Sequence, residues 1–160
     1  MERIPEIKAS FSLMKRDGVD FDREAVSRLL DLTPTCSRPP EPGKGLLYAD
    51  GPEPGADLPG LTVLPAERPP YAYLKNAAWE LELPKEKSWS AQETLRTLAD
   101  RLEGRSGQVR ALCEAFELFA LVELTLYADA STLPEVGLSC EDLAFWAEMG
   151  AEVNFAFYLD

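Results

Sequence analysis

Four segments of this 160-residue chain alternate apolar and polar residues with a period of two, and this pattern constrains the fold more than any other feature. Successive side chains of a strand point to opposite faces, so the alternation predicts strands with one buried face. The predicted strands are Glu6 to Met14, Ala77 to Leu83, Leu118 to Ala128 and Ala151 to Leu159. Each strand needs a layer of helices against its apolar side.

Amphipathic segments between these strands predict the helices. The first runs from Asp22 to Asp31, and the next begins at Ser90 and ends near Phe116, interrupted at Gly104 and Gly107, which indicates a kink or two short helices. Another begins at Ser139-Cys140-Glu141-Asp142 and stops at Gly150. The resulting order is β-α-β, a helical segment and then β-α-β.

This order predicts one α+β domain over residues 1–160. We expect a two-layer sandwich that is ferredoxin-like in character, with a mostly antiparallel sheet of four or more strands and helices on one face. Residues 39–70 interrupt the pattern with 9 of the 13 prolines and 5 of the 10 glycines. Such a segment cannot form one regular helix or strand interior. It is interpreted as a long insertion that is either functional or loosely ordered.

The chain has no histidine, which excludes more chemistry than any other observation. Ser-His-Asp and Cys-His nucleophile systems, and histidine-based zinc or iron sites, cannot be built within one chain. The cysteines Cys36, Cys113 and Cys140 are far apart and match no zinc or redox motif, so they are interpreted as reduced structural thiols. We therefore expect no catalytic residues, no metal and no cofactor.

The formal net charge of −12 bears on the class of partner. Nucleic acids and anionic lipids bind through Lys and Arg, so neither is expected as a partner, whereas a basic protein would be attracted. Acidity that only keeps the protein in solution is the alternative. The N-terminal residues lack the pattern of a signal peptide, and no apolar run reaches the roughly 18 residues of a membrane span, so we expect a cytoplasmic protein.

The polar sides of the predicted strands form the candidate interaction face. Glutamates and tyrosines alternate with the core positions there: Glu80, Glu82, Glu123, Tyr127, Glu152 and Tyr158. Tyrosines of this kind are common in protein interfaces. A sheet face that is simply solvated remains the alternative, because antiparallel sheets commonly leave one face in water.

Several stretches of the chain resemble the bacterial domain-of-unknown-function family 4279. In the N-terminal half and the second long strand, they are Ala9-Ser10-Phe11-Ser12-Leu13, Asp22 to Leu32 with Thr33-Pro34-Thr35, and Trp79-Glu80-Leu81. At the end, they are Val136-Gly137-Leu138-Ser139, Leu143, Glu148-Met149-Gly150-Ala151 and Phe157-Tyr158. These are core and turn residues, so the resemblance implies a fold and supplies no activity and no catalytic residue.

The leading hypothesis from the sequence is a non-enzymatic protein-interaction domain whose acidic sheet face meets a basic partner. One form of it is an immunity-type protein that neutralises a basic bacterial toxin, by analogy with other small acidic proteins. The alternative is a small-molecule or peptide-binding module in which residues 39–70 cover a groove. The sequence predicts neither the oligomeric state nor the identity of the partner.

Overall fold

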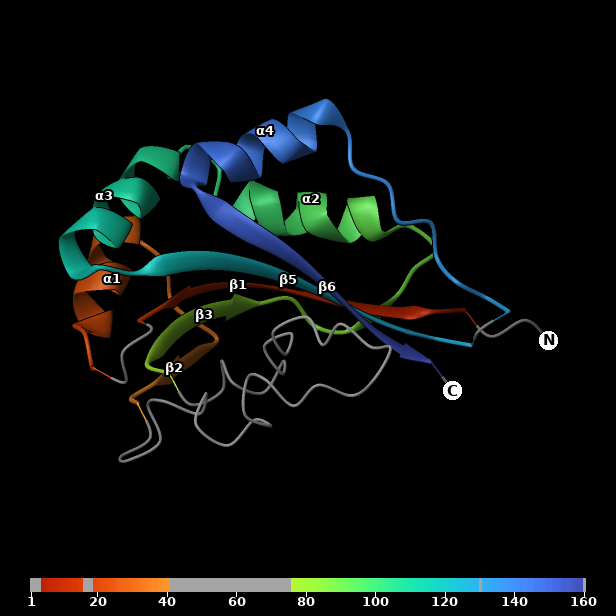
Figure 1. Ribbon diagram of the computed structural model, residues 1–160, viewed down its shortest axis with the longest axis horizontal. Coiled ribbons are helices and arrows are strands. Elements are labelled where there is room, and N and C mark those ends of the chain that lie inside the picture. The colour runs from red at the N-terminus through yellow and green to blue at the C-terminus, as the bar shows by residue number, and fades with distance from the viewer. Residues whose placement is uncertain (1–3, 16–18, 41–75, 130, 160) are drawn as a thin grey trace, which may run out of the picture.

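A computed structural model describes residues 4–15, 19–40, 76–129 and 131–159 of the chain (Figure 1). The elements in chain order are β1 (Glu6–Met14), α1 (Arg23–Leu30), β2 (Cys36–Arg38), β3 (Ala78–Glu82), β4 (Glu86–Lys87), α2 (Ala91–Arg101), α3 (Ser106–Phe116), β5 (Phe119–Ala128), α4 (Cys140–Met149) and β6 (Ala151–Leu159). The four long strands lie where the alternation predicts them. The predicted helical segment before β5 is two helices.

The sheet has the strand order β2-β3-β1-β5-β6, with β4 pairing on one end of β1. All neighbours are antiparallel except β5 and β6, which run parallel and are joined by α4. A parallel pair needs a crossover connection, and the helix before β6 supplies it. The expectation of a mostly antiparallel sheet in a two-layer α+β arrangement is confirmed.

Local sequence signals explain where the helices begin and end. The Asp22 carboxylate accepts a hydrogen bond from the Ala25 amide at 2.8 Å and starts α1, and Ser139 caps α4. Gly104 separates α2 from α3 with φ 73°, and Gly150 ends α4 with φ 70°, a left-handed conformation that glycine adopts without strain. Among the described residues, no helix combines the length and the apolar character needed to span a membrane.

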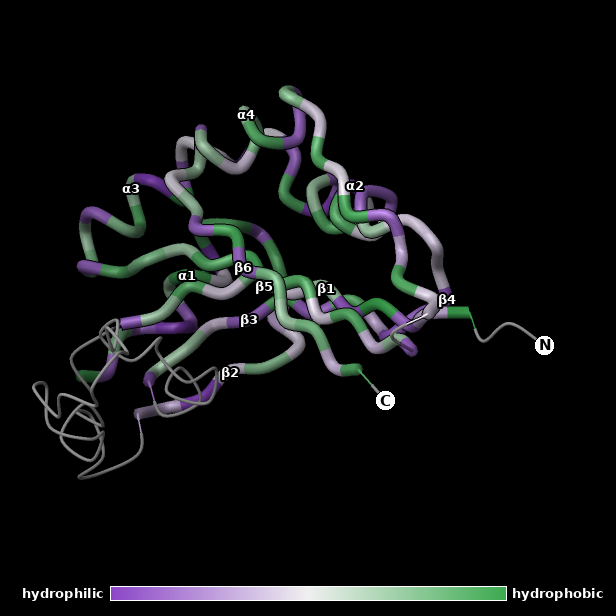
Figure 2. Tube along the Cα trace, turned by 45° about the vertical axis from the view of Figure 1, so that its right-hand side comes forward, coloured by the Kyte–Doolittle hydropathy of each residue, from purple (hydrophilic) through white to green (hydrophobic). Residues whose placement is uncertain are grey.

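The helices α1 to α4 of the described residues cover the same face of the sheet, as Figures 1 and 2 show from two directions. The main core lies between the two layers and includes Trp79 and Trp146, which are almost completely buried. Trp146 of α4 stacks on Phe11 of the central strand β1, with ring centroids 6.5 Å apart. The indole N–H of Trp79 donates to the Ser27 hydroxyl of α1 at 2.9 Å, which satisfies its buried polar group.

Two short strands were not predicted. β2 and β4 have three and two residues, too few for a periodic pattern to be recognised. They form because the edges of β3 and β1 offer unpaired backbone groups. The predicted insertion at 39–70 lies almost entirely outside the described residues, which resume at residue 76.

Candidate functional site on the outer face of the sheet

The outer face is the side of the sheet opposite the helices. The six predicted residues all occupy strand positions that alternate with core residues and so project from this face: Glu80, Glu82, Glu123, Tyr127, Glu152 and Tyr158. No helix of the described part of the chain covers it (Figure 1). The sequence prediction therefore selected one contiguous side of the sheet.

The register places the central strand between two of the glutamates. Ser10 of β1 is paired with Glu82 of β3 on one side and with Glu123 of β5 on the other. Two strand spacings put the Cα atoms of these glutamates roughly 10 Å apart. Glu152 of β6 is paired with Leu121, which lies two residues before Glu123 on β5. Glu152 is therefore a diagonal neighbour of Glu123 on the same face. The four glutamates thus span four neighbouring strands, with β1 contributing none of them.

Two ion pairs partly neutralise the predicted glutamates of β3. The Lys8 ammonium donates to the Glu82 carboxylate at 2.7 Å, and the Arg38 guanidinium lies 2.8 Å from the Glu80 carboxylate. The hydrogen bond to Glu82 raises the pKa of Lys8. Glu80 is only 13% exposed in its side chain, so its charge is committed to Arg38. Exposed pairs of this kind contribute little to stability, whereas removing one partner of a covered pair is costly because it leaves the other charge unpaired.

Glu123 has no cationic side chain of the described chain within ion-pairing distance. Its burial raises its pKa, and the negative charges of Glu80 and Glu82 raise it further, while Lys8 lowers it. The upward shift means that the folded protein disfavours the ionised form of this carboxyl group. The outer face therefore holds more negative charge around Glu123 than its own cations neutralise.

Two tyrosines form the other part of the candidate face. Tyr127 and Tyr158, on paired strands, stack with ring centroids 5.1 Å apart and an angle of 14° between their planes. The Lys85 ammonium lies 4.0 Å from the centre of the Tyr127 ring and 2.5 Å from the Glu6 carboxylate. Tyr158 is half exposed, so one ring of this stack is accessible to a partner.

An apolar cluster at one end of the outer face was missed. Met14, Ala78 and Leu121 are buried there, with Phe119 packed against them. A signal was present, because Phe119-Ala120-Leu121-Val122 is apolar without interruption, which is typical of a strand buried on both faces. Acidic and aromatic groups accessible to a partner are thus found toward the other end and toward β6.

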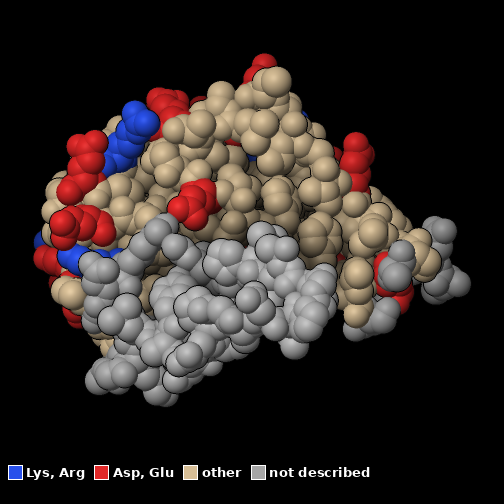
Figure 3. Space-filling model, in the orientation of Figure 1, with Lys and Arg blue, Asp and Glu red and all other residues tan. Residues whose placement is uncertain are grey.

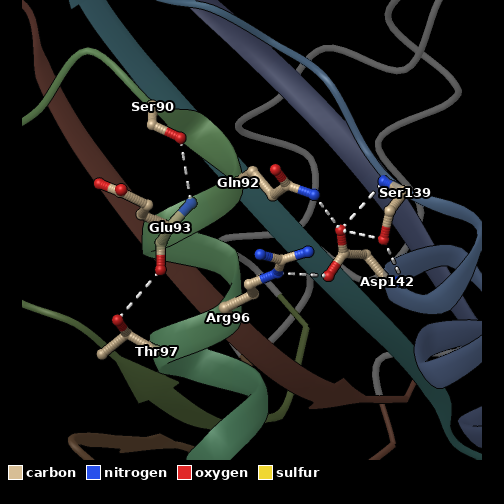
Figure 4. A network of polar contacts seen from close by, with 7 residues as sticks. All are labelled: Ser90, Gln92, Glu93, Arg96, Thr97, Ser139 and Asp142. Carbon is tan, nitrogen blue, oxygen red and sulfur yellow. Dashed lines mark hydrogen bonds and ion pairs between the residues drawn. The ribbon is translucent and has the colours of Figure 1, made fainter.

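The strongest polar network of the described structure lies between α2 and α4 (Figure 4). The Asp142 carboxylate accepts hydrogen bonds from Gln92 at 2.6 Å, from Arg96 at 3.0 Å, and from the amide and hydroxyl of Ser139 at 3.0 and 2.7 Å. Burial alone raises the pKa of Asp142, but these hydrogen bonds together hold it well below its usual range. A carboxylate whose two oxygens together accept four hydrogen bonds acts as a structural link between two helices.

A shallow hollow lies beside this network. Its floor is apolar, formed by Leu95, Phe145 and Trp146, and the acids Asp100 and Glu141 stand at its rim. Its volume of about 220 Å³ is below the roughly 300 Å³ at which small-molecule sites begin. The groove of the alternative hypothesis was placed beneath residues 39–70, of which 41–70 lie outside the described residues.

The described residues contain no group of three or more cysteine, aspartate or glutamate side chains arranged to hold a metal ion. Cys36, Cys113 and Cys140 are all free thiols. Burial raises the pKa of Cys113 to about 11, so its thiol is protonated at neutral pH and acts as part of the core.

The chain belongs to the family described as Domain of unknown function (DUF4279), whose model matches residues 64–160, more than half of the chain. The resemblance found in the sequence is confirmed by this match. The matched range contains β3 to β6 and hence all six residues of the candidate face. No curated protein and no solved structure matches the chain.

Proposed function

We propose that this chain is a non-enzymatic protein-interaction domain that binds a basic partner through the outer face of its sheet. The observation that carries the proposal is the arrangement around Glu123. Glu82 and Glu152 flank this glutamate on the same face, and its pKa is raised first by burial and then by the negative charges of Glu80 and Glu82. A cationic side chain placed there would relieve the repulsion and gain an ion pair.

The accessible part of this surface also has the composition of an interface. Tyr158 presents a half-exposed ring that is held in place by stacking on Tyr127, so little side-chain entropy is lost on binding. The net charge of −12 adds a long-range attraction for a basic partner and speeds the encounter. We assign Glu80 a supporting role, because its side chain is paired with Arg38 and only 13% exposed, whereas Glu82, paired with Lys8, is 36% exposed.

The proposal also covers the compartment and the biological role of the protein. A bacterial cytoplasmic protein that neutralises a basic toxin, in the manner of an immunity protein, is the form we favour, by analogy with small acidic proteins of that kind. Three free thiols support a reducing compartment, since proteins of oxidising compartments commonly pair their cysteines.

The test is capture of proteins from the native host by purified wild-type protein and by two charge variants. The first variant carries Glu82→Gln, Glu123→Gln and Glu152→Gln on the outer face. The matched control carries Asp100→Asn, Glu103→Gln and Glu141→Gln, exposed acids of the helix layer. Both variants lose three negative charges, so a difference between them reports position and not net charge.

We expect a basic protein that the wild type and the helix-layer control retain and that the outer-face variant loses. Identification by mass spectrometry establishes the charge of the captured protein. Equal loss from both variants would show that only the overall charge matters. Equal retention by all three proteins would refute the assignment of the outer face.

A further inference from the structure

The strand β6 forms an edge of the sheet that lacks the usual protection. It stands at the end of the strand order, and within the described residues no strand pairs with its outer side. From Val153 to Leu159 it has no charged residue, no proline and no glycine. Edge strands are usually short, charged or interrupted by proline, because their free N–H and C=O groups offer a template for another strand.

The opposite edge of the same sheet provides the contrast. β2 has only three residues, ends with Arg38 and is followed by Pro39 and Pro40. Shortness, charge and proline all hinder pairing at that edge. The sheet therefore protects one edge and leaves the last seven residues of β6, Val153 to Leu159, without charge or proline.

Apolar side chains become more exposed along β6. Val153 is half-buried near α4, whereas Phe155 is 36% and Phe157 50% exposed on the same side of the strand. Leu159 and Tyr158 are also half exposed, so the end of the strand is apolar on both faces. Figure 1 shows β6 running away from α4 toward the C-terminus, and Figure 3 shows a largely uncharged surface in this region.

We propose that two copies of this chain pair through β6, antiparallel about a two-fold axis, and join their sheets into one. Charge favours a second copy at this place. With 28 acids against 16 bases, most contacts between copies bring like charges together, and the last seven residues of β6 carry none. The only charge within the strand is Glu152, at its beginning.

A register centred on Phe157 makes the strand complementary to itself. Phe157 then lies opposite its own copy, and Phe155 lies opposite Leu159 of the second copy. Ala156 lies opposite the larger Tyr158, and Glu152 extends beyond the paired region, so no like charges meet. Paired residues differ by an even number of positions in this register. Side chains that share a face in one copy therefore meet side chains of the same face in the other copy.

The exposed area determines how strong this dimer is. Phe155, Phe157 and Tyr158 are 36%, 50% and 53% exposed, so at about 200 Å² for each residue they present roughly 280 Å² per copy before Leu159 and the backbone are added. The area that the two copies bury together is below the roughly 1,000 Å² that a specific, stable interface is expected to exceed. The dimer therefore dissociates on dilution and forms as the protein is concentrated.

The experiment is sedimentation equilibrium of the full chain from about 1 μM to about 500 μM. Phe157→Lys places two ammonium groups opposite each other at the axis, although it lowers the net negative charge of the protein. Leu29→Lys is the matched control. Leu29 is 56% exposed, and its helix α1 contacts β3, toward the edge of the sheet opposite β6. We expect Phe157→Lys to raise the dissociation constant about tenfold or more, since the axis applies the change twice, and Leu29→Lys to leave it unchanged.

Hydrogen exchange on the wild type provides a second readout that needs no variant. Amides of β6 gain protection as the protein is concentrated, whereas amides of β2 do not. If Phe157→Lys does not fold, Leu159→Lys at the end of the strand takes its place in the sedimentation series. A wild-type monomer at every concentration, or a dimer that these variants leave unchanged, overturns the proposal. Self-association and partner capture are separate measurements, so this inference stands or falls independently of the proposed function.

Discussion

Replacing Asp142 by asparagine tests the link between α2 and α4. The substitution keeps the shape of the side chain and removes its charge. One carboxylate oxygen accepts from Gln92 and Ser139, and the other accepts from Arg96. An amide supplies an acceptor at only one of these positions, so its NH₂ group faces a donor in either orientation.

The size of the effect follows from the exposure of each partner. The Asp142 side chain is 10% exposed, and hydrogen bonds to a covered charged group contribute about 1.5–3 kcal/mol each. The Arg96 side chain is 52% exposed, so solvent screens its ion pair with Asp142 and the pair contributes little. Because the donors share one acceptor group and do not add, we expect Asp142→Asn to lower the free energy of unfolding by about 2 kcal/mol.

The pH dependence gives a second, independent test. The folded pKa of Asp142 lies below the unfolded value of about 3.9, so its stabilising effect is present above that pH and is lost as the pH falls toward the folded pKa. Urea unfolding is measured at pH 7 and at about pH 3 for the wild type, Asp142→Asn and the control Asp100→Asn, which changes an exposed acid of α2, the helix that carries Gln92 and Arg96. Equal stability of the two variants at pH 7, or a difference that does not shrink in acid, would refute the role given to Asp142.

Three further predictions concern single side chains. Glu123→Gln raises the free energy of unfolding at pH 7 by about 0.5 kcal/mol, because the raised folded pKa marks an unfavourable charge, and in urea titrations the gain disappears below about pH 4.3. In thiol-labelling kinetics of the native protein, exposed Cys140 reacts much faster than Cys113, and urea removes the difference; equal native rates would contradict the burial of Cys113. Trp79→Phe lowers the free energy of unfolding by about 2 kcal/mol because it leaves a gap and removes the donor to Ser27, and a loss below about 0.5 kcal/mol in urea titration would contradict that packing.

The long elements could be predicted from the sequence because each contains its own signal. Nine residues of β1 alternate between the core and the outer face, and Gly104 and Gly150 mark helix ends by their backbone freedom. These signals are local and therefore do not depend on where the neighbouring strands lie. The acidic residues of the outer face were found in the same way, from the polar half of each alternation.

The strand order and the contacts between elements could not be predicted in this way. That Lys8 binds Glu82 and also acts on the charge of Glu123 follows from β1 being central, which depends on pairing between segments more than 70 residues apart. The sequence predicts that Asp142 lies in the first turn of a helix, but it does not predict the hydrogen bonds of Asp142 to another helix. Its partners Gln92 and Arg96 are 50 and 46 residues away and carry no pattern that marks them. Contacts of this kind are set by packing and not by the local sequence.

The central claim is that the outer face binds a basic partner, and the rate of association as a function of salt tests it most directly. The captured partner is mixed with the wild type, with the variant lacking the charges of Glu82, Glu123 and Glu152, and with the helix-layer control at low and moderate ionic strength. The account predicts slower association and a flatter salt dependence for the outer-face variant alone, because steering depends on where the charges lie. Identical rates and salt slopes for the two variants would contradict it.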